Sequence, residues 1–252
     1  MIRAFALLLM LAAPALGEES IVAGLSQNRV SITAGFTGEE IMIYGAIRRQ
    51  APPPDGPPMQ VIVTVEGPSS PLVVRKKERR AGIWVNAESV EIDSAPSFYA
   101  VASTVPLSEA LSEIDNLRHR ITIPRAIRAV GITGEAADAP AFVEALLRLR
   151  EAEGNYRLNE GAVSLAEATL FRTDVVLPSN LVEGDYRVRL FITRGGHVVD
   201  WQEQIIPVRK AGLERAIFAM SREKPFAYGL LSVSLAIMAG WLASTVFRLL
   251  RA

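Results

Sequence analysis

The stretch from Phe226 to Phe247 contains no charged residue, and it constrains this chain more than any other feature. About 22 residues at about 1.5 Å per residue give a helix of about 33 Å, long enough to cross a hydrocarbon core of about 30 Å. We therefore predict a single transmembrane helix over residues 226–247 and a tail of residues 248–252. Everything before the helix is expected to work at a membrane surface.

The other end of the chain has the pattern of a signal peptide. Arg3 precedes an apolar run over residues 4–13, and Ala15-Leu16-Gly17 offers a small-x-small cleavage site. The run is too short to cross a bilayer. We predict a signal peptide over residues 1–17. Export would place the ectodomain in the periplasm of a bacterium, the helix in the inner membrane and the C-terminus in the cytoplasm.

The charges that flank the helix oppose this orientation. Five basic residues lie in or next to the predicted juxtamembrane segment 211–225 and two follow the helix: Arg209, Lys210, Arg215, Arg222 and Lys224, then Arg248 and Arg251. The positive-inside rule alone would invert the protein. We give priority to the signal peptide, because it starts export of the chain before the helix is made. The orientation of the helix is then already fixed, and the helix stops the transfer. The outer basic residues then suit contact with lipid phosphates.

Composition narrows the chemistry of the ectodomain. Lys+Arg and Asp+Glu are equal at 27 each, so the chain lacks the basic excess that a nucleic-acid partner requires. Cysteine is absent, which excludes thiolate nucleophiles, disulfides and Cys-ligated metals. About 200 residues between the two apolar ends are ample for one or two hydrophobic cores.

Apolar and other residues alternate in the first half of the ectodomain, which indicates β-strands. The clearest alternation covers residues 41–47 and 61–66, and shorter candidate strands cover residues 29–33, 72–75, 82–85 and 98–105. Short strands separated by turns are typical of a β-sandwich. We predict that residues 18–105 form the first part of a sandwich in a mainly β protein.

The period changes to that of a helix in the middle of the chain. Pro106 can open a helix whose apolar face carries Leu107, Ala110, Leu111, Ile114 and Leu117. Pro140 can open a second helix that ends at Gly154, and residues 125–139 between the two are expected to be a loop. We predict a helical insertion over residues 106–160.

Strands return over residues 161–210. An alternating strand from Tyr186 leads through a Gly195-Gly196 turn into a second strand, which predicts a hairpin. Leu181-Val182-Glu183-Gly184-Asp185-Tyr186 is typical of the tyrosine corner of immunoglobulin-like domains, with Tyr186 as its structural tyrosine. We predict an immunoglobulin-like β-sandwich whose last two strands follow the insertion. Two separate small domains are the alternative.

Several strings along the chain form a recognisable combination. They are Arg75-Lys76-Lys77-Glu78-Arg79, Ala81-Gly82-Ile83-Trp84-Val85-Asn86, Ala168-Thr169-Leu170-Phe171-Arg172, Glu183-Gly184-Asp185-Tyr186, Tyr228-Gly229-Leu230 and residues 240–248. With these strings the chain resembles a family of alphaproteobacterial transmembrane proteins. The resemblance implies a signal sequence, a periplasmic portion and a C-terminal anchor, with no assigned activity. It also implies similarity to accessory proteins encoded near sulfite-exporter-type permeases. It supplies no catalytic residues.

The residues do not predict an enzyme. The two histidines, His119 and His197, lie in different predicted elements, and the chain has neither a His-x-x-x-His pair nor a Gly-x-Ser-x-Gly elbow. We therefore predict no catalytic residue, no metal site and no cofactor.

A basic cluster is the strongest polar feature of the ectodomain, formed by Arg75, Lys76, Lys77, Arg79 and Arg80. It can be a solvated strand end, a contact for anionic lipid headgroups or a site for an anionic ligand. Trp84 follows closely and is expected in the core.

Small residues recur at every fourth position of the predicted transmembrane helix, at Ser232, Ala236, Gly240 and Ser244. Such a stripe lets a second helix approach closely. We therefore expect a bilayer and a membrane-protein partner or a second copy as partners, with the ectodomain acting as a non-enzymatic binding or assembly module. An anion-sensing or solute-binding accessory subunit of a permease is the alternative.

Overall fold

The computed structural model describes residues 19–33, 35–49, 56–128, 139–210, 217 and 220–250, with side chains placed as far as Ser244. The predicted signal peptide, most of the predicted juxtamembrane segment and residues 251–252 lie outside the described residues. The mainly β class and the C-terminal apolar helix are confirmed.

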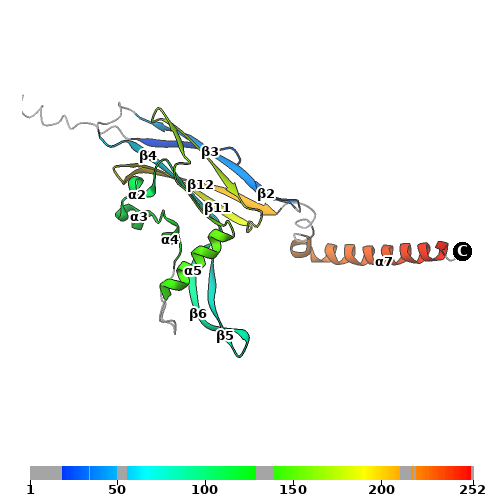
Figure 1. Cartoon of the computed structure of the whole chain (residues 1–252). Coiled ribbons are helices and arrows are strands. Elements are labelled where there is room, and N and C mark those ends of the chain that lie inside the picture. The colour runs from blue at the N-terminus through cyan, green and yellow to red at the C-terminus, as the bar shows by residue number, and fades with distance from the viewer. Residues whose placement is uncertain are drawn as a thin grey trace, which may run out of the picture.

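The strands form two large sheets, which are stacked in Figure 1. Sheet A has four strands in the order β1 (Ser20–Leu25), β3 (Glu39–Arg48), β10 (Leu170–Leu177) and β9 (Ser164–Ala166). Sheet B has six strands in the order β2 (Val30–Ile32), β12 (His197–Lys210), β11 (Gly184–Arg194), β4 (Met59–Glu66), β7 (Tyr99–Ser103) and β8 (Tyr156–Asn159). Neighbouring strands are antiparallel except in the pairs β2–β12 and β7–β8.

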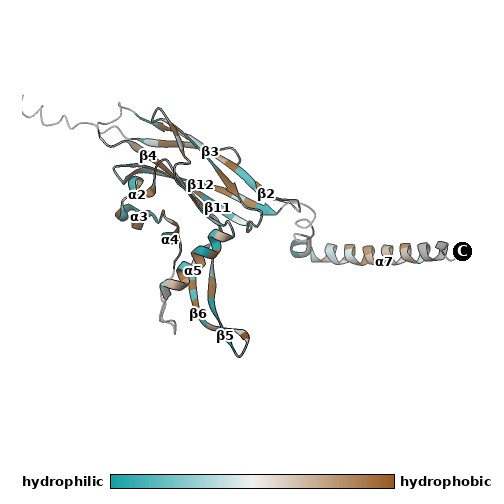
Figure 2. Cartoon of the chain, viewed as in Figure 1, coloured by the Kyte–Doolittle hydropathy of each residue, from teal (hydrophilic) through white to brown (hydrophobic). Residues whose placement is uncertain are grey.

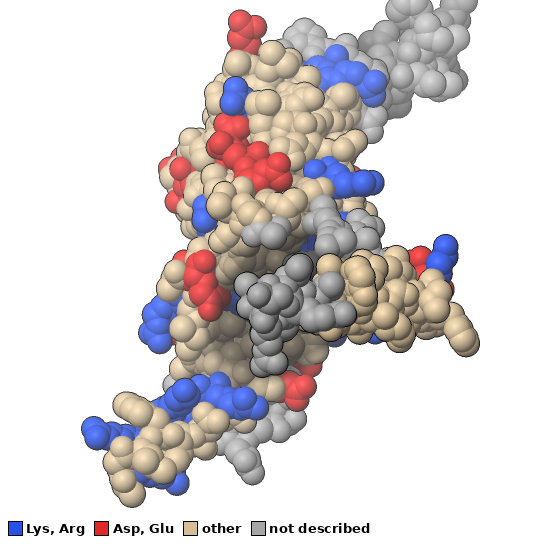
Figure 3. Space-filling model, turned by 90° about the vertical axis from the view of Figure 1, so that its right-hand side faces the viewer, with Lys and Arg blue, Asp and Glu red and all other residues tan. Residues whose placement is uncertain are grey.

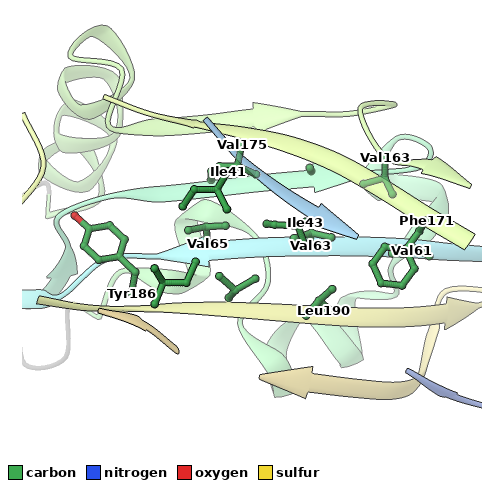
Figure 4. Packing of buried hydrophobic residues seen from close by; sticks show 14 of the residues in the cluster. Ile41, Ile43, Val61, Val63, Val65, Val163, Phe171, Val175, Tyr186 and Leu190 are labelled. Carbon is green, nitrogen blue, oxygen red and sulfur yellow. The ribbon is translucent and has the colours of Figure 1, made fainter. Parts of the chain in front are cut away.

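A first hydrophobic core fills the space between the two sheets (Figure 4). Alternate residues of each strand point into it, as the period of two in a β-strand requires. Sheet A contributes Ile41 and Ile43, which face Val63, Val65 and other residues of sheet B. The alternation seen in residues 41–47 and 61–66 therefore reports this core.

A second core lies on the opposite face of sheet B. Ile62 and Phe191 point outward from β4 and β11 and are fully buried, together with Tyr99 of β7. Four helices of the insertion cover them: α2 (Leu107–Ala110), α3 (Glu113–His119), α4 (Ile123–Ala126) and α5 (Ala139–Ala152). Strand β4 is consequently buried on both faces.

The helix predicted to begin after Pro106 is broken into α2 and α3, and its predicted apolar face is wrong. Leu111 leaves the helical conformation, and Ser112 caps the first turn of α3 by accepting a hydrogen bond from the amide of Asp115. The break turns α3, so that Leu111 is buried whereas Ile114 and Leu117 are exposed. The predicted loop after Arg125 also begins late, since α4 includes Arg125, and residues 129–138 lie outside the described part.

Five strands, and not only the predicted two, follow α5 in the two large sheets: β8, β9, β10, β11 and β12. The hairpin of β11 and β12 forms as predicted, with Gly195 and Gly196 at positive φ angles of 56° and 82° in its turn. Strands β9 and β10, which were not predicted, complete sheet A. The sequence of β10 includes Arg172, Thr173 and Asp174, so its alternation is hidden from a hydropathy pattern although Thr173 is buried.

Two elements project from the body of the molecule (Figures 1 and 2). One is a two-stranded hairpin of β5 (Ser69–Arg80) and β6 (Ile83–Pro96), with α5 alongside it. The other is α7 (Pro225–Leu250), a continuous helix whose side chains from Pro225 to Ser244 are all exposed. The single long apolar helix of the described residues therefore has the length and composition of a membrane span.

The buried carboxylate of Glu19, which lies just before β1, forms ion pairs with two arginines. Glu19 is 7% exposed and accepts hydrogen bonds from Arg49 at 2.7 Å and from Arg194 at 2.9 Å. Burial alone would raise the pKa of Glu19, but the hydrogen bonds from the two guanidinium groups outweigh it and lower the pKa. The carboxylate thus links the start of β1 to β3 and β11.

Replacing Glu19 by Gln should lower the free energy of unfolding of the full chain in detergent by about 3 kcal/mol at pH 7, because two largely buried guanidinium groups, at 13% and 17% exposure, lose their counter-charge. Since the pKa of Glu19 is lowered by folding, its contribution is present above its unfolded pKa of about 4.3 and is lost as the pH falls through the folded value. Denaturation of the two proteins at several pH values tests this. The difference in free energy of unfolding between the unaltered protein and the variant should disappear in acid. A difference that is independent of pH would contradict this account, and so would a difference equal to that of the exposed control Glu183→Gln.

Candidate functional site

Two insertions interrupt the strands of sheet B, one before β7 and one after it. They contact each other near the first residue of β7. The hairpin of β5 and β6 lies between β4 and β7, and helices α2 to α5 lie between β7 and β8. The hydroxyl of Tyr156 donates to the carbonyl of Pro96 at 2.8 Å, and the amide of Tyr99 donates to the carbonyl of Asn155 at 2.9 Å. Burial raises the pKa of Tyr156 to about 12, so its hydroxyl remains a donor. These bonds hold the base of the hairpin next to the end of α5.

A groove of about 340 Å³ lies between β5 and α5. Its apolar lining comes from Val74 of the hairpin and from Phe142, Ala145 and Leu149 of the helix. Three cations border it and are called here the groove cations: Arg75, Lys76 and Arg148. Glu88 is the acidic residue of the lining and lies 3.9 Å from the ammonium group of Lys76. The groove combines an apolar surface with a net positive border, and its volume lies within the range of ligand pockets.

A β-bulge divides the predicted basic cluster into two parts. Lys76 pairs with Glu88 across the hairpin but Lys77 pairs with Asn86, so that Ala87 is the extra residue between them. Arg75 and Lys76 line the groove, whereas the remaining members, Lys77, Arg79 and Arg80, lie beyond the bulge. The five basic residues are therefore close in space but do not form one site.

The outer part of the hairpin is called here the hairpin apex and consists of Lys77, Arg79, Arg80, Ile83 and Trp84. Its turn is Ala81-Gly82, both residues having positive φ angles, of 48° and 85°. Trp84 is 68% exposed and Ile83 is 64% exposed, so the expectation that Trp84 lies in the core is wrong. The physical reason is length: the hairpin extends past both cores, and no described element covers its end.

Positive charge is concentrated on the hairpin. Residues 75–88 contain five basic and two acidic side chains, in a chain whose formal net charge is zero. The two acids are partly neutralised by Lys76 and Arg80, at 3.9 and 3.3 Å. Figure 3 shows Lys and Arg side chains gathered at the lower end of the molecule, where Figure 1 places the hairpin.

The predicted tyrosine corner has the hydrogen bond that its name requires. The hydroxyl of Tyr186 donates to the carbonyl of Val182 at 3.0 Å, while the ring is buried in the first core. Burial raises the pKa of this hydroxyl. Tyr186 thus belongs to the first core, and the lining of the groove does not include it.

The two histidines lie in separate environments. The Nδ1 atom of His197 is 3.0 Å from a carboxylate oxygen of the buried Asp115, a contact that the sequence spacing did not suggest. His119 instead packs against Phe191 and Trp201, with ring centroids 5.6 and 6.3 Å away. Burial lowers the pKa of His119.

The Asp115 carboxylate joins α3 to the start of β12. Burial would raise the pKa of Asp115, but hydrogen bonds from His197, Ser112 and the amide of Val198 outweigh it and lower the pKa. Among the described residues, no group of three or more His, Cys, Asp or Glu side chains is arranged to hold a metal ion.

The four small residues predicted to pack against another helix all lie on α7, where their side chains are exposed: Ser232, Ala236, Gly240 and Ser244. The hydroxyl of Ser232 donates to the carbonyl of Tyr228 at 2.9 Å and so is satisfied within its own helix. The hydroxyl of Ser232 therefore does not require a partner outside its own helix.

The arrangement of a mainly β domain and one C-terminal apolar helix agrees with the comparison with known families. The model of the family described as "Putative transmembrane protein" matches residues 20–249, which is nearly the whole chain. The chain belongs to this transmembrane protein family. The predicted resemblance is thereby confirmed, and membrane association of this family member follows from the match and from α7.

Other comparisons add little to the family match. No curated protein matches the chain. Among solved structures, the chain aligns with Spo0M, a sporulation control protein from Bacillus subtilis, at 12% sequence identity and a TM-score of 0.28. The alignment covers 82% of this chain and 56% of that one, so the family member spans little more than half of the solved protein.

Proposed function

We propose that the protein is a single-pass inner-membrane protein with a periplasmic ectodomain and a cytoplasmic C-terminus. The signal-peptide pattern of residues 1–17 supports this orientation. The basic residues before α7 then face the outer lipid surface.

We also propose that the ectodomain is immunoglobulin-like. The order β1-β3-β10-β9 corresponds to strands A, B, E and D, and the order β12-β11-β4-β7 corresponds to G, F, C and C′. The hydrogen bond of Tyr186 near the start of the strand that corresponds to F supports the same assignment. In this scheme the hairpin is inserted between C and C′, and the helices follow C′.

We propose that this ectodomain is a non-enzymatic binding or assembly module for a membrane partner. The observation that carries the proposal is the groove between β5 and α5, which both insertions build at the edge of the second core. Its apolar lining and groove cations fit a protein segment that presents apolar side chains and at least one carboxylate. Because α7 anchors the ectodomain, the groove can meet such a segment only within the plane of the membrane, which raises the effective concentration of the partner.

A photo-crosslinking residue at Ala145 tests the proposal, because this side chain lines the groove. In native membranes it should give one discrete adduct with an integral membrane protein. Arg148→Glu should reduce the yield by about tenfold, because it reverses one groove cation. Arg172→Glu on β10 is the matched control and should leave the yield unchanged. The same adducts from Ala145 as from the exposed Leu158 of β8 would contradict the proposal.

The alternative is an anion-sensing or solute-binding accessory subunit of a sulfite-exporter-type permease. The groove cations favour it, since Arg75 and Arg148 can both donate to a small oxyanion. This function is distinguished by thermal stabilisation of the full chain by sulfite or sulfate, at constant ionic strength, together with the absence of the Ala145 adduct.

We further propose that α7 pairs with another transmembrane helix through its small residues. Gly240→Leu adds bulk to the stripe and should reduce co-purification of the partner, or dimer formation, by at least about tenfold. Ser234→Leu is the matched control, because position 234 lies about 120° around the helix from Gly240. Equal association of both variants in detergent and in membranes would exclude pairing through this face.

A further inference from the structure

We propose that the hairpin apex enters the headgroup layer of the bilayer that α7 crosses and forms a second membrane contact. The residues concerned are Ile83 and Trp84 at the end of β6, with Lys77, Arg79 and Arg80 on β5. The proposal does not depend on the groove, whose lining contains none of these five residues.

The apolar part of the apex has the composition of an interfacial anchor. Ile83 and Trp84 are more than 60% exposed, and Trp is the residue that collects at membrane–water interfaces. Each lies directly opposite an arginine across the hairpin, Ile83 opposite Arg80 and Trp84 opposite Arg79. Both faces of the apex therefore combine one apolar and one cationic side chain.

Charge complementarity identifies a lipid surface. The apex carries three basic residues, and Glu78, which lies 3.3 Å from Arg80, is the acidic residue between them. Basic side chains next to apolar ones bind membranes that contain anionic lipids, because the charges contact headgroups while the apolar groups enter the acyl boundary. Figure 3 views the molecule from the side on which α7 leaves, and the basic side chains of the hairpin are exposed on that side.

The size of the apex favours lipid over a protein partner. A stable protein–protein interface needs about 800 Å² from each partner, which two apolar side chains on a two-stranded hairpin do not supply. A contact of this size suffices for a chain that α7 already holds at the bilayer, because tethering makes the second contact intramolecular.

The geometry allows the apex to reach the membrane. Residues 72–80 of β5 extend about 30 Å at the rise of a β-strand. The hairpin and α7 point in different directions in Figure 1, so insertion requires the ectodomain to lean towards the membrane. Residues 211–224 connect β12 to α7; the described residues 217 and 220–223 of this segment are helical, and 14 residues span about 21 Å at the rise of a helix.

A fluorescent label at the turn of the hairpin tests the proposal. Because the chain has no cysteine, Ala81→Cys provides a unique attachment site that leaves Ile83 and Trp84 in place. The full chain is reconstituted in vesicles of phosphatidylethanolamine and phosphatidylglycerol at about 3:1, and quenching by nitroxide lipids is measured. We expect strong quenching at position 81 and little at the control Val199→Cys on β12.

Variants of the apex separate its two contributions. Ile83→Ser with Trp84→Ser should abolish quenching at position 81. Replacing Lys77, Arg79 and Arg80 by Gln should lower the ratio of inserted to free apex about fivefold for each removed charge at low salt. Thermal unfolding should be unchanged in both variants, since all five side chains are exposed.

Two results would overturn the proposal. One is equal access of aqueous iodide to labels at positions 81 and 199 in these vesicles. The other is a protected label in native membranes that becomes exposed in vesicles of lipid alone, which would identify a protein as the occupant of the apex.

Discussion

The architecture depends on one constraint, which is that sheet B is apolar on both faces. Val63 and Val65 of β4 point to sheet A, and Ile62 of the same strand points the other way with Phe191 of β11. Burial of a large apolar side chain contributes about 1.5–3 kcal/mol, so a sheet with two apolar faces must be covered twice. Sheet A covers one face, and helices α2 to α5 cover the other.

This constraint also creates the candidate site. The helices that cover the second core end in α5, and Leu146 and Phe142 fix that helix by burial. The bond from the Tyr156 hydroxyl to the Pro96 carbonyl then places the hairpin beside it. The groove is therefore a consequence of packing on sheet B. The hairpin apex extends beyond this support, which leaves Trp84 exposed to solvent or lipid.

Alternation with a period of two predicts strands, and a long uncharged run predicts a membrane-spanning helix. Both could be recognised in the sequence because each depends only on residues that are close together in the chain. The helix from Phe226, the strands around Ile43 and Val63, and the Gly195-Gly196 hairpin follow directly from such patterns. The break between α2 and α3 could not be predicted, since it arises from the hydrogen bond between the amide of Ser112 and the carbonyl of Gly196 at 2.7 Å.

The candidate site was predicted only in part. The basic residues from Arg75 to Arg80 were identified by composition, but their division by the bulge at Lys76 depends on register. Arg148 and Leu149 were missed because they join the groove through tertiary packing of α5. Gly82 was placed in a predicted strand over residues 82–85, and Ala81-Gly82 was the available signal that a turn precedes Trp84 and that Trp84 lies at the end of a hairpin.

The central claim is that the second core holds α5 in place and thereby forms the groove. Hydrogen exchange of the full chain in detergent tests this most directly, because it reports the stability of each element separately. The amides of α5 should be protected to a degree comparable with those of β4, and Leu146→Ala should speed exchange in α5 while leaving β3 unchanged. Exchange of α5 in the unaltered protein at the rate of an isolated helix would contradict the account.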